Sequence, residues 1–361
     1  MSERIFNFSA GPGCLAEEVL QQIRQDVWNI AGSGIGILEH SHRGKVFDKV
    51  LEEAEADMRE VASIPKNYKV LFLTGGATTQ NFMVPANMLP EGGTADYLVT
   101  GYWAEKSAEE AKFYGNVHEA ASSKGANHSY IPSDSELKYS ARPAYVHYTS
   151  NNTIYGTEFH RIPACPEGVP LVCDMSSDFV SRPCDISKFG LIYAGAQKNV
   201  GPAGTTVVII RDDLLEPKRP LPTMLKYAVH AKDGSRHNTP PAFSIYAVGV
   251  VLKWMKKMGG VKHFETYNKE KAGLIYGVLD QSKFYKGHAR ADSRSLMNIT
   301  FRTPSAELDD LFCKEAGKHG MDGLKGHRAT GGMRASTYNA FPREGCVALA
   351  QFMRDFEKKH G

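Results

Sequence analysis

The sequence predicts an α/β protein in which helices cover both faces of a mainly parallel β-sheet, with a smaller α+β domain toward the C-terminus. Two observations carry this prediction. Short apolar runs of strand length recur up to residue 210, and several are followed by stretches compatible with helices. Beyond about residue 259 the pattern changes to long helical segments with one intervening strand.

The N-terminal part predicts two amphipathic helices. In residues 15–30 apolar side chains recur at helical spacing, at Val19, Leu20, Ile23, Val27 and Ile30. Residues 46–61 repeat this spacing, with Val46, Val50, Ala54, Met58 and Val61 on one face. Each helix is therefore expected to turn one face toward a core.

The apolar runs are expected to form the strands of the sheet. They cover residues 70–73, 97–99, 144–146, 171–173, 191–194 and 207–210. Runs that are apolar on both faces are typical of a parallel sheet buried between helices. Functional residues in such sheets gather at the carboxyl ends of the strands, so we expect the chemistry to lie directly after these runs.

The remaining elements predict a long helix and then the smaller domain. A helix is expected from about Pro241 to Met258, where Gly259 and Gly260 end it. After it, the pattern predicts helices over residues 262–279, 306–319 and 343–360 and a strand over residues 296–301.

Composition narrows the class of protein. The chain has 361 residues, 42% of them hydrophobic, which is enough for about two domains with sizeable cores and excludes a disordered or fibrous protein. Its 43 basic and 40 acidic residues give a net charge of +3. No nucleic-acid or membrane partner is expected from this balance, so an anionic partner should be small and locally bound.

The cysteines and the first residues indicate the cellular compartment of the protein. The six cysteines include no Cys-x-x-Cys pair and no cluster with histidine at metal-ligand spacing, so we expect free thiols and no metal. The first residues lack a hydrophobic signal segment, and no run of 18 apolar residues exists. A soluble cytoplasmic protein is expected.

Two residues at strand ends point to a cofactor. Lys198 is the only charged residue between positions 189 and 210, and it is either a lysine that reaches water or a desolvated amine suited to forming an imine. Asp174 ends another apolar run, where a helix cap is the ordinary role. Together a lysine and a carboxylate on neighbouring strand ends match the needs of pyridoxal phosphate.

Two further features follow strands. Gly75 and Gly76 stand between a strand and a helix-compatible stretch, where backbone amides can approach an anion, although any corner of this kind can use glycines. Trp103 follows the run at residues 97–99 and is either a packing residue or a plate for a flat ring.

Arginines next to histidines suggest an anionic substrate. His42-Arg43 and His327-Arg328 are two such pairs, and Arg334 follows close to the second. Surface ion pairs with Glu39 or Asp322 are the ordinary alternative for each arginine. Because arginine binds carboxylate and phosphate with two parallel hydrogen bonds, the set suggests a substrate with two anionic groups.

Several long motifs resemble the phosphoserine aminotransferases, a family of class V aminotransferases that depend on pyridoxal phosphate. The motifs read NFSAGP at residues 7–12, SHRGK at 41–45, GYW at 101–103, AGAQKNVGPAG at 194–204, NTPP at 238–241, KGHR at 325–328 and RAS at 334–336. The resemblance runs from about Phe6 to Gly361. It implies a fold-type I enzyme with a seven-stranded, mainly parallel sheet between helices, with residues 16–258 as the large cofactor-binding domain and residues 1–15 and 259–361 as the small α+β domain.

The resemblance also implies roles for individual residues. Lys198 matches the Schiff-base lysine, Asp174 the partner of the pyridinium nitrogen, and Trp103 the aromatic stacked on the ring. The other cofactor contacts are implied for Ala77, Thr78, Thr153 and Gln197, with Asn238 and Thr239 reaching the phosphate of the other subunit in a homodimer. The implied substrate-binding residues are His42, Arg43, His327, Arg328 and Arg334, of which Arg334 takes the α-carboxylate.

The implied reaction moves an amino group between L-glutamate and 3-phosphohydroxypyruvate, giving O-phospho-L-serine and 2-oxoglutarate for serine biosynthesis. Two positions depart from the familiar bacterial pattern: the turn at residues 75–79 reads GGATT, and Asn152 stands where glutamate is common. The alternatives are an alanine-glyoxylate type aminotransferase, a cysteine desulfurase, and a non-catalytic relative that binds a phosphorylated metabolite.

Overall fold

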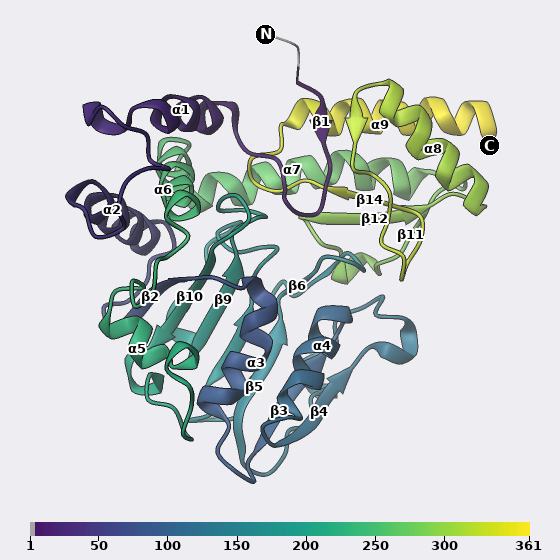
Figure 1. The fold of residues 1–361 in the computed structure, drawn as a ribbon. Helices are drawn as coiled ribbons and strands as arrows, with labels where there is room; N and C mark the ends of the chain where they lie inside the picture. Colours follow the sequence, from purple (N-terminus) through teal and green to yellow (C-terminus); the bar gives the residue numbers. More distant parts are fainter. Residues whose placement is uncertain (1–3) are drawn as a thin grey trace.

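The computed structural model describes residues 4–361 and centres on a seven-stranded sheet (Figure 1). Its strands lie in the order β2-β10-β9-β8-β5-β3-β4. They are β2 (Tyr68–Leu73), β3 (Thr94–Val99), β4 (Asn116–Ser122), β5 (Pro143–Thr149), β8 (Leu171–Asp174), β9 (Leu191–Gly195) and β10 (Thr206–Arg211). Only β10 runs antiparallel to its neighbours in this sheet, which confirms the predicted α/β fold with a mainly parallel sheet.

Helices cover both faces of this sheet. On one face, alternate strand residues such as Val70 and Phe72 pack in one cluster with α1 (Glu17–Trp28), α2 (Lys45–Val61) and α6 (Ala242–Lys257). On the other, Leu71 and Leu73 pack with α3 (Gly76–Met88), α4 (Tyr102–Ala111) and α5 (Tyr227–Lys232). Both N-terminal helices are thus confirmed, although Val27, expected on the buried face of α1, is 37% exposed because α1 lies at the end of the molecule.

One strand of the seven-stranded sheet has no counterpart among the predicted apolar runs. The edge strand β4 pairs only with β3, and only Ala120 and Ala121 along it are buried. An edge strand that meets water along much of its length does not need an apolar sequence.

The C-terminal layer, residues 260–361, carries its own small sheets. It contains α7 (Gly260–Gln281), β11 (Lys286–Gly287), β12 (Asn298–Arg302), α8 (Ala306–Lys318), β13 (Met321–Asp322), β14 (Met333–Ser336) and α9 (Arg343–His360). β11, β12 and β14 form an antiparallel sheet, and β1 (Phe6–Asn7) pairs in parallel with β13. The helices expected over residues 262–279 and 306–319 are therefore confirmed with shifted ends, and the helix expected over residues 343–360 is confirmed with the predicted ends.

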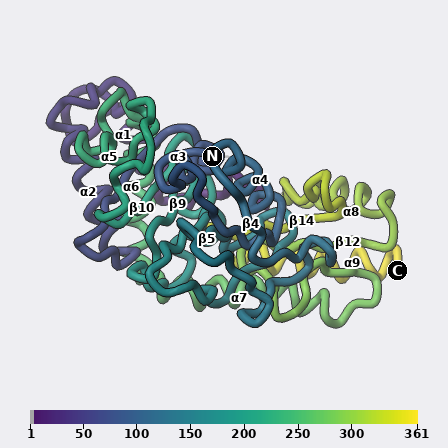
Figure 2. Tube along the Cα trace, turned by 90° about the horizontal axis from the view of Figure 1, so that it is seen from below, coloured from purple at the N-terminus to yellow at the C-terminus, as the bar shows by residue number. Residues whose placement is uncertain are grey.

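The two ends of the chain meet in this layer. Phe8 lies in the same hydrophobic cluster as Phe312, Met333 and Phe356. Figure 2 shows α1 and α2 at one end of the molecule and α8 and α9 at the other. The proposed domain boundaries stay a prediction, and the part of the first segment before residue 4 lies outside the described residues.

Within residues 4–361, no helix is both long and apolar enough to cross a membrane. All six cysteines are unpaired. The hairpin of β6 (Asn151–Asn152) and β7 (Thr157–Glu158) follows β5 and leads from the central sheet toward the C-terminal layer.

Candidate active site

A cavity of about 140 Å³ lies where the carboxyl ends of β5, β8 and β9 meet the N-termini of α3 and α4. It is the position that the fold class predicts for a site. The structure brings together at this cavity the predicted residues Ala77, Thr78, Trp103, Thr153, Asp174, Gln197 and Lys198.

Lys198 follows β9 and points its amine at two hydroxyl groups. Nζ of Lys198 donates hydrogen bonds to Oγ1 of Thr153 and to Oγ of Ser177, at 2.8 Å each. Burial lowers the pKa of the Lys198 amine to about 8, and the positive charge of Arg334 adds to this effect, while Asp174 and Asp178 oppose it. Lys198 is partly buried, and its amine is held by protein hydroxyl groups, in keeping with the lowered pKa.

Asp174 ends β8 and is 6% exposed. The backbone N–H of Ser176 donates to its Oδ1 at 2.9 Å. Burial raises the pKa of the Asp174 carboxyl, and the nearby charge of Lys198 and hydrogen bonding from Ser176 lower it in part. A carboxylate in such a place gains most from a positively charged partner in the cavity.

The turn between β2 and α3 is built for an anion. Gly75 and Gly76 have φ angles of +93° and +69°, which favour glycine, and a Cβ on Gly75 would lie 1.9 Å from Oγ1 of Thr79. Gly76, Ala77 and Thr78, in the first turn of α3, line the cavity, where the free backbone N–H groups and the helix dipole favour a phosphate.

Trp103 lies in the first turn of α4. The side chain of Asn152 packs against the backbone of the turn that precedes this helix. Asn152 is buried and donates hydrogen bonds to Oγ1 of Thr100 and of Thr157, at 3.1 Å each. A Cβ on Gly101 would lie 2.4 Å from Oδ1 of Asn152. Asn152, whose role the sequence left open, therefore braces the turn that carries Trp103.

Two of the predicted anion-binding residues approach the cavity from the C-terminal layer. Arg334 on β14 donates from Nη1 to the backbone oxygen of Thr153 at 3.3 Å, and burial lowers the pKa of its guanidinium. The His327 ring lies 5.9 Å from the ring of Tyr102, beside Trp103. Burial and the charges of Arg334 and Arg328 lower the pKa of His327.

The structure does not bring the other predicted residues into this cavity. Arg43 and Arg328 are exposed, and His42 is only half-buried. Across residues 4–361, none of the arginines Arg43, Arg328 and Arg334 pairs with a carboxylate, so the surface ion pairs considered above are absent from the described structure.

Asn238 and Thr239 are also exposed and lie outside the cavity. Asn238 lines a separate cavity of about 200 Å³, whose wall includes Thr74, Gly75 and Thr79 on the opposite side of the glycine turn.

Other residues line the cavity without having been predicted: Asn81, Thr149, Asn151, Ser176 and Ser177. Four of them follow or end the strands β5 and β8, so the strand-end rule could have found them. Asn81 lies one helical turn beyond Ala77 on α3.

The residues at the cavity fit pyridoxal phosphate. A desolvated amine, a buried carboxylate, an indole and an anion-binding helix N-terminus surround one space, and these are the groups that the aldehyde, the ring nitrogen, the ring face and the phosphate of that cofactor require. Asp174 and Lys198 also lie at the ends of adjacent strands, β8 and β9.

Comparison with known proteins agrees with this chemistry. The family model for aminotransferase class-V matches residues 5–349. A phosphoserine aminotransferase of Lysinibacillus sphaericus is 53% identical over 362 residues, with both chains covered completely. The solved phosphoserine aminotransferase from Bacillus circulans subsp. alkalophilus is 50% identical and superposes with a TM-score of 0.97 over 100% of each chain.

A PLP-bound phosphoserine aminotransferase from Trichomonas vaginalis is 37% identical, with a TM-score of 0.93 over 97% of this chain and 100% of that one. The chain belongs to the aminotransferase class-V family, whose members use pyridoxal 5′-phosphate. Within that family it belongs with the phosphoserine aminotransferases of serine biosynthesis.

Proposed function

We propose that the protein transfers an amino group reversibly between L-glutamate and 3-phosphohydroxypyruvate, giving O-phospho-L-serine and 2-oxoglutarate. The observation that carries the proposal is the meeting of Lys198, Asp174 and Trp103 at one cavity in a chain of this family. The free cysteines and the family suggest the cytoplasm as the place of the reaction.

In this proposal each cofactor residue holds one part of pyridoxal phosphate. Asp174 pairs with the ring nitrogen, Trp103 stacks on the ring, and Thr153 contacts the side of the ring that carries the hydroxyl. The first turn of α3 at Ala77 and Thr78 binds the phosphate together with the side chain of Gln197. When bound, the cofactor supplies a sink for the electron pair left at the substrate Cα.

Lys198 would then act as the proton carrier. With the cofactor and substrate bound, its amine would move a proton between the substrate Cα and the C4′ position of the cofactor. A pKa near 8 leaves part of the amine neutral at physiological pH, so that it can accept that proton. Asp174, kept anionic by its ring partner, holds the ring nitrogen protonated.

The two anionic ends of the substrate need two cationic sites. Arg334 is half-buried at the cavity edge and takes the α-carboxylate, with His327 beside it. The distal carboxylate or phosphate needs His42, Arg43, His327 and Arg328. Because His42 and Arg43 lie outside the cavity of their own chain, we assign them to the site of a second subunit.

The same reasoning applies to Asn238 and Thr239, which are exposed beside the glycine turn but outside the cofactor cavity. We propose that they contact the cofactor phosphate of the partner in a homodimer. Each active site is then completed only when two chains associate.

The alternatives fit less well. A cysteine desulfurase needs a reactive thiolate in a mobile loop, whereas Cys313 and Cys346 lie in α8 and α9, and burial raises the pKa of these thiols to about 11 and about 12. An alanine-glyoxylate type enzyme would have little use for two His-Arg pairs. A non-catalytic binding protein has no need for a desolvated lysine beside a buried carboxylate.

Half-reactions with single amino donors test the proposal. The purified holoenzyme is mixed in turn with phosphoserine, glutamate, serine and alanine, and the conversion of its visible absorbance band is followed. Phosphoserine and glutamate should convert the band rapidly, and serine and alanine slowly. Equal rates for anionic and neutral donors would contradict the assigned substrates, and no conversion with any donor would contradict transamination.

A further inference from the structure

The Lys198 amine rests against two hydroxyl groups, of which only Thr153 has a role so far. Nζ of Lys198 lies 2.8 Å from Oγ1 of Thr153 and 2.8 Å from Oγ of Ser177, and the two hydroxyls are hydrogen-bonded to each other. Ser177 is 2% exposed and lines the cavity. Its hydroxyl therefore lies at the atom that carries the proton in the proposed reaction.

Buried asparagines brace the backbone at Ser177. Nδ2 of Asn199, the residue after the lysine, donates to the backbone oxygen of Ser177 at 2.6 Å. Oδ1 of Asn199 accepts from the backbone N–H of Asn339 at 3.0 Å, and Nδ2 of Asn339 donates to the backbone oxygen of Val180 at 3.0 Å. The turn that carries Ser177 is thus tied both to the lysine segment and to the C-terminal layer.

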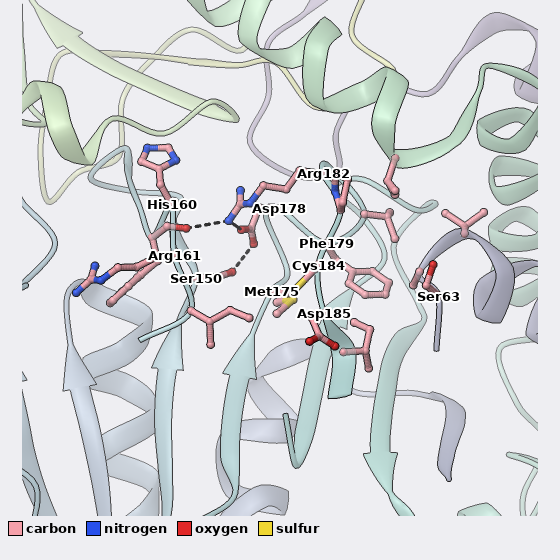
Figure 3. A pocket seen from close by; sticks show the side chains of 18 of the residues that line it. Ser63, Ser150, His160, Arg161, Met175, Asp178, Phe179, Arg182, Cys184 and Asp185 are labelled. Atoms are coloured by element: carbon pink, nitrogen blue, oxygen red, sulfur yellow. Dashed lines mark hydrogen bonds and ion pairs between the residues drawn. The ribbon is translucent and has the colours of Figure 1, made fainter. Parts of the chain in front are cut away.

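The opposite side of this turn is braced as well, around a third cavity of about 270 Å³ (Figure 3). There Oδ1 of Asp178 accepts from Ser150, and Oδ2 accepts from Nη2 of Arg182 at 3.1 Å. Arg182 also binds Glu158 and donates to the backbone oxygen of Phe159 at 2.8 Å. Because hydrogen bonds hold both sides of the turn, the Ser177 side chain is directed toward Lys198.

A hydroxyl is the suitable partner for an amine that changes its protonation state. It accepts a hydrogen bond from an ammonium and donates one to a neutral amine, whereas a carboxylate only accepts. The charged groups Asp174, Asp178 and Arg334 act on Lys198 through their charge, but among the described residues its hydrogen-bond partners are the hydroxyls of Thr153 and Ser177.

We propose that Ser177 is a positioning residue for the reaction, whose hydroxyl holds the Lys198 amine beside the reacting carbons during the proton transfer. It accepts from the amine when the amine carries the extra proton and donates to it when the amine is neutral. The proton that moves comes from the substrate Cα and leaves from Nζ, so the serine keeps its own proton. This inference rests on the proposed role of Lys198 as the proton carrier.

The first test measures the lysine itself in the cofactor-free protein. Trace acetylation over a range of pH, read by mass spectrometry of the peptide that contains Lys198, gives the pKa of its amine. The wild type should titrate near pH 8. Ser177→Ala removes an acceptor of the ammonium, so its pKa should fall by about half a unit to one unit, and Ser177→Thr should restore it.

The second test measures the proton transfer in the holoenzyme. Single-turnover reactions with glutamate and with glutamate deuterated at Cα give a rate and an isotope effect. Ser177→Ala should lower the rate about tenfold or more and increase the isotope effect, with little change in glutamate affinity. Ser181→Ala, a substitution of another buried serine of the same turn, is the matched control and should leave the lysine pKa and the isotope effect unchanged.

The two serine-to-alanine variants decide the question even if the threonine variant does not fold. A Lys198 pKa and an isotope effect that are the same in Ser177→Ala and in the wild type would overturn the inference. Equal changes in Ser177→Ala and Ser181→Ala would also overturn it, because they would mark a general effect on the turn. Failure of the proposed function looks different: the wild-type holoenzyme would then be converted by no amino donor, or equally fast by anionic and neutral donors.

Discussion

The two ends of the proposed substrate site differ in how far a single chain completes them. At the cofactor end, strand ends from β5, β8 and β9 bring Thr153, Asp174 and Lys198 around one cavity. At the distal end, Arg43 lies on an exposed turn, with no hydrogen bond or ion pair to a lining residue of that cavity within residues 4–361. The sheet therefore positions the residues proposed to hold the cofactor, while Arg43, proposed to recognise the substrate, lies on a surface segment.

The residues at the two ends of the site are held in place in different ways. Asp174 ends β8, and Lys198 lies in the turn that follows the adjacent strand β9, so both keep their geometry as long as the sheet is folded. His42 and Arg43 lie in the loop before α2, where Arg43 is exposed and His42 is partly buried, and we propose that they serve the site of a second chain. The predictions below test each end separately.

The largest effect is expected at the cofactor end. Lys198→Ala should fold but lose turnover by about four powers of ten or more, because no other amine among residues 4–361 lines the cavity. The purified variant should also lack the visible band that depends on the lysine. Its far-ultraviolet circular dichroism serves as the folding control, and full turnover in a folded variant would end the assignment.

The next largest effect concerns the distal end. Arg43→Ala and Arg328→Ala each remove a pair of charge-assisted hydrogen bonds to the distal anion, which corresponds to a loss of about one to two powers of ten in kcat/KM. The loss should appear with phosphoserine and glutamate and be much smaller with serine and alanine. Comparable losses for all four donors would mean that these arginines support the fold or the cofactor instead.

The packing at the cofactor end should also appear in the free energy of unfolding. Gly101→Ala places a Cβ 2.4 Å from Oδ1 of Asn152, in a buried contact without room to relax. The free energy of unfolding should fall by about 1–3 kcal/mol in urea denaturation. Gly125→Ala is the control, since nothing lies within 4 Å of its Cβ, and a similar loss in both variants would refute the role of Asn152 as a brace.

The smallest predicted effect is a pH dependence. Burial lowers the pKa of Lys198 to about 8 from 10.5, so the amine becomes neutral, and able to attack an aldehyde, at a lower pH than an exposed lysine. The rate at which the cofactor-free protein captures pyridoxal phosphate should rise about tenfold from pH 7 and level off above pH 8 to 9. A rate that keeps rising to pH 10 would indicate an ordinary lysine.

The sequence predicted the residues that combine charge or unusual shape with a position after an apolar run. Lys198 stood alone in an uncharged segment, and Asp174 ended a buried strand, so both could be found before the fold was known. Ser177 carries no charge, and the strand-end rule would have marked it only as one of several residues that follow β8. Its contact with Lys198 depends on the distance between two strand ends, which single-sequence patterns do not contain.

The same limit applies to the elements of the fold. Strands buried on both faces, such as β8 and β9, were visible as apolar runs. β4 was not, because it is an edge strand with polar residues, and neither was β14, whose four residues include Arg334. Short or exposed strands are defined by their partners and not by their own composition.

We expect that one chain supplies Lys198 and Asp174 to an active site and that a second chain completes its distal anion site. Mixed dimers of Lys198→Ala and Arg43→Ala chains, produced by co-expression with two different tags, test it directly. If Arg43 serves the partner's site, a mixed dimer contains one intact site and one doubly defective site, and a statistical mixture should recover about a quarter of the wild-type activity with phosphoserine. Activity no higher than the average of the two single variants would show that Arg43 serves its own chain and would contradict the account.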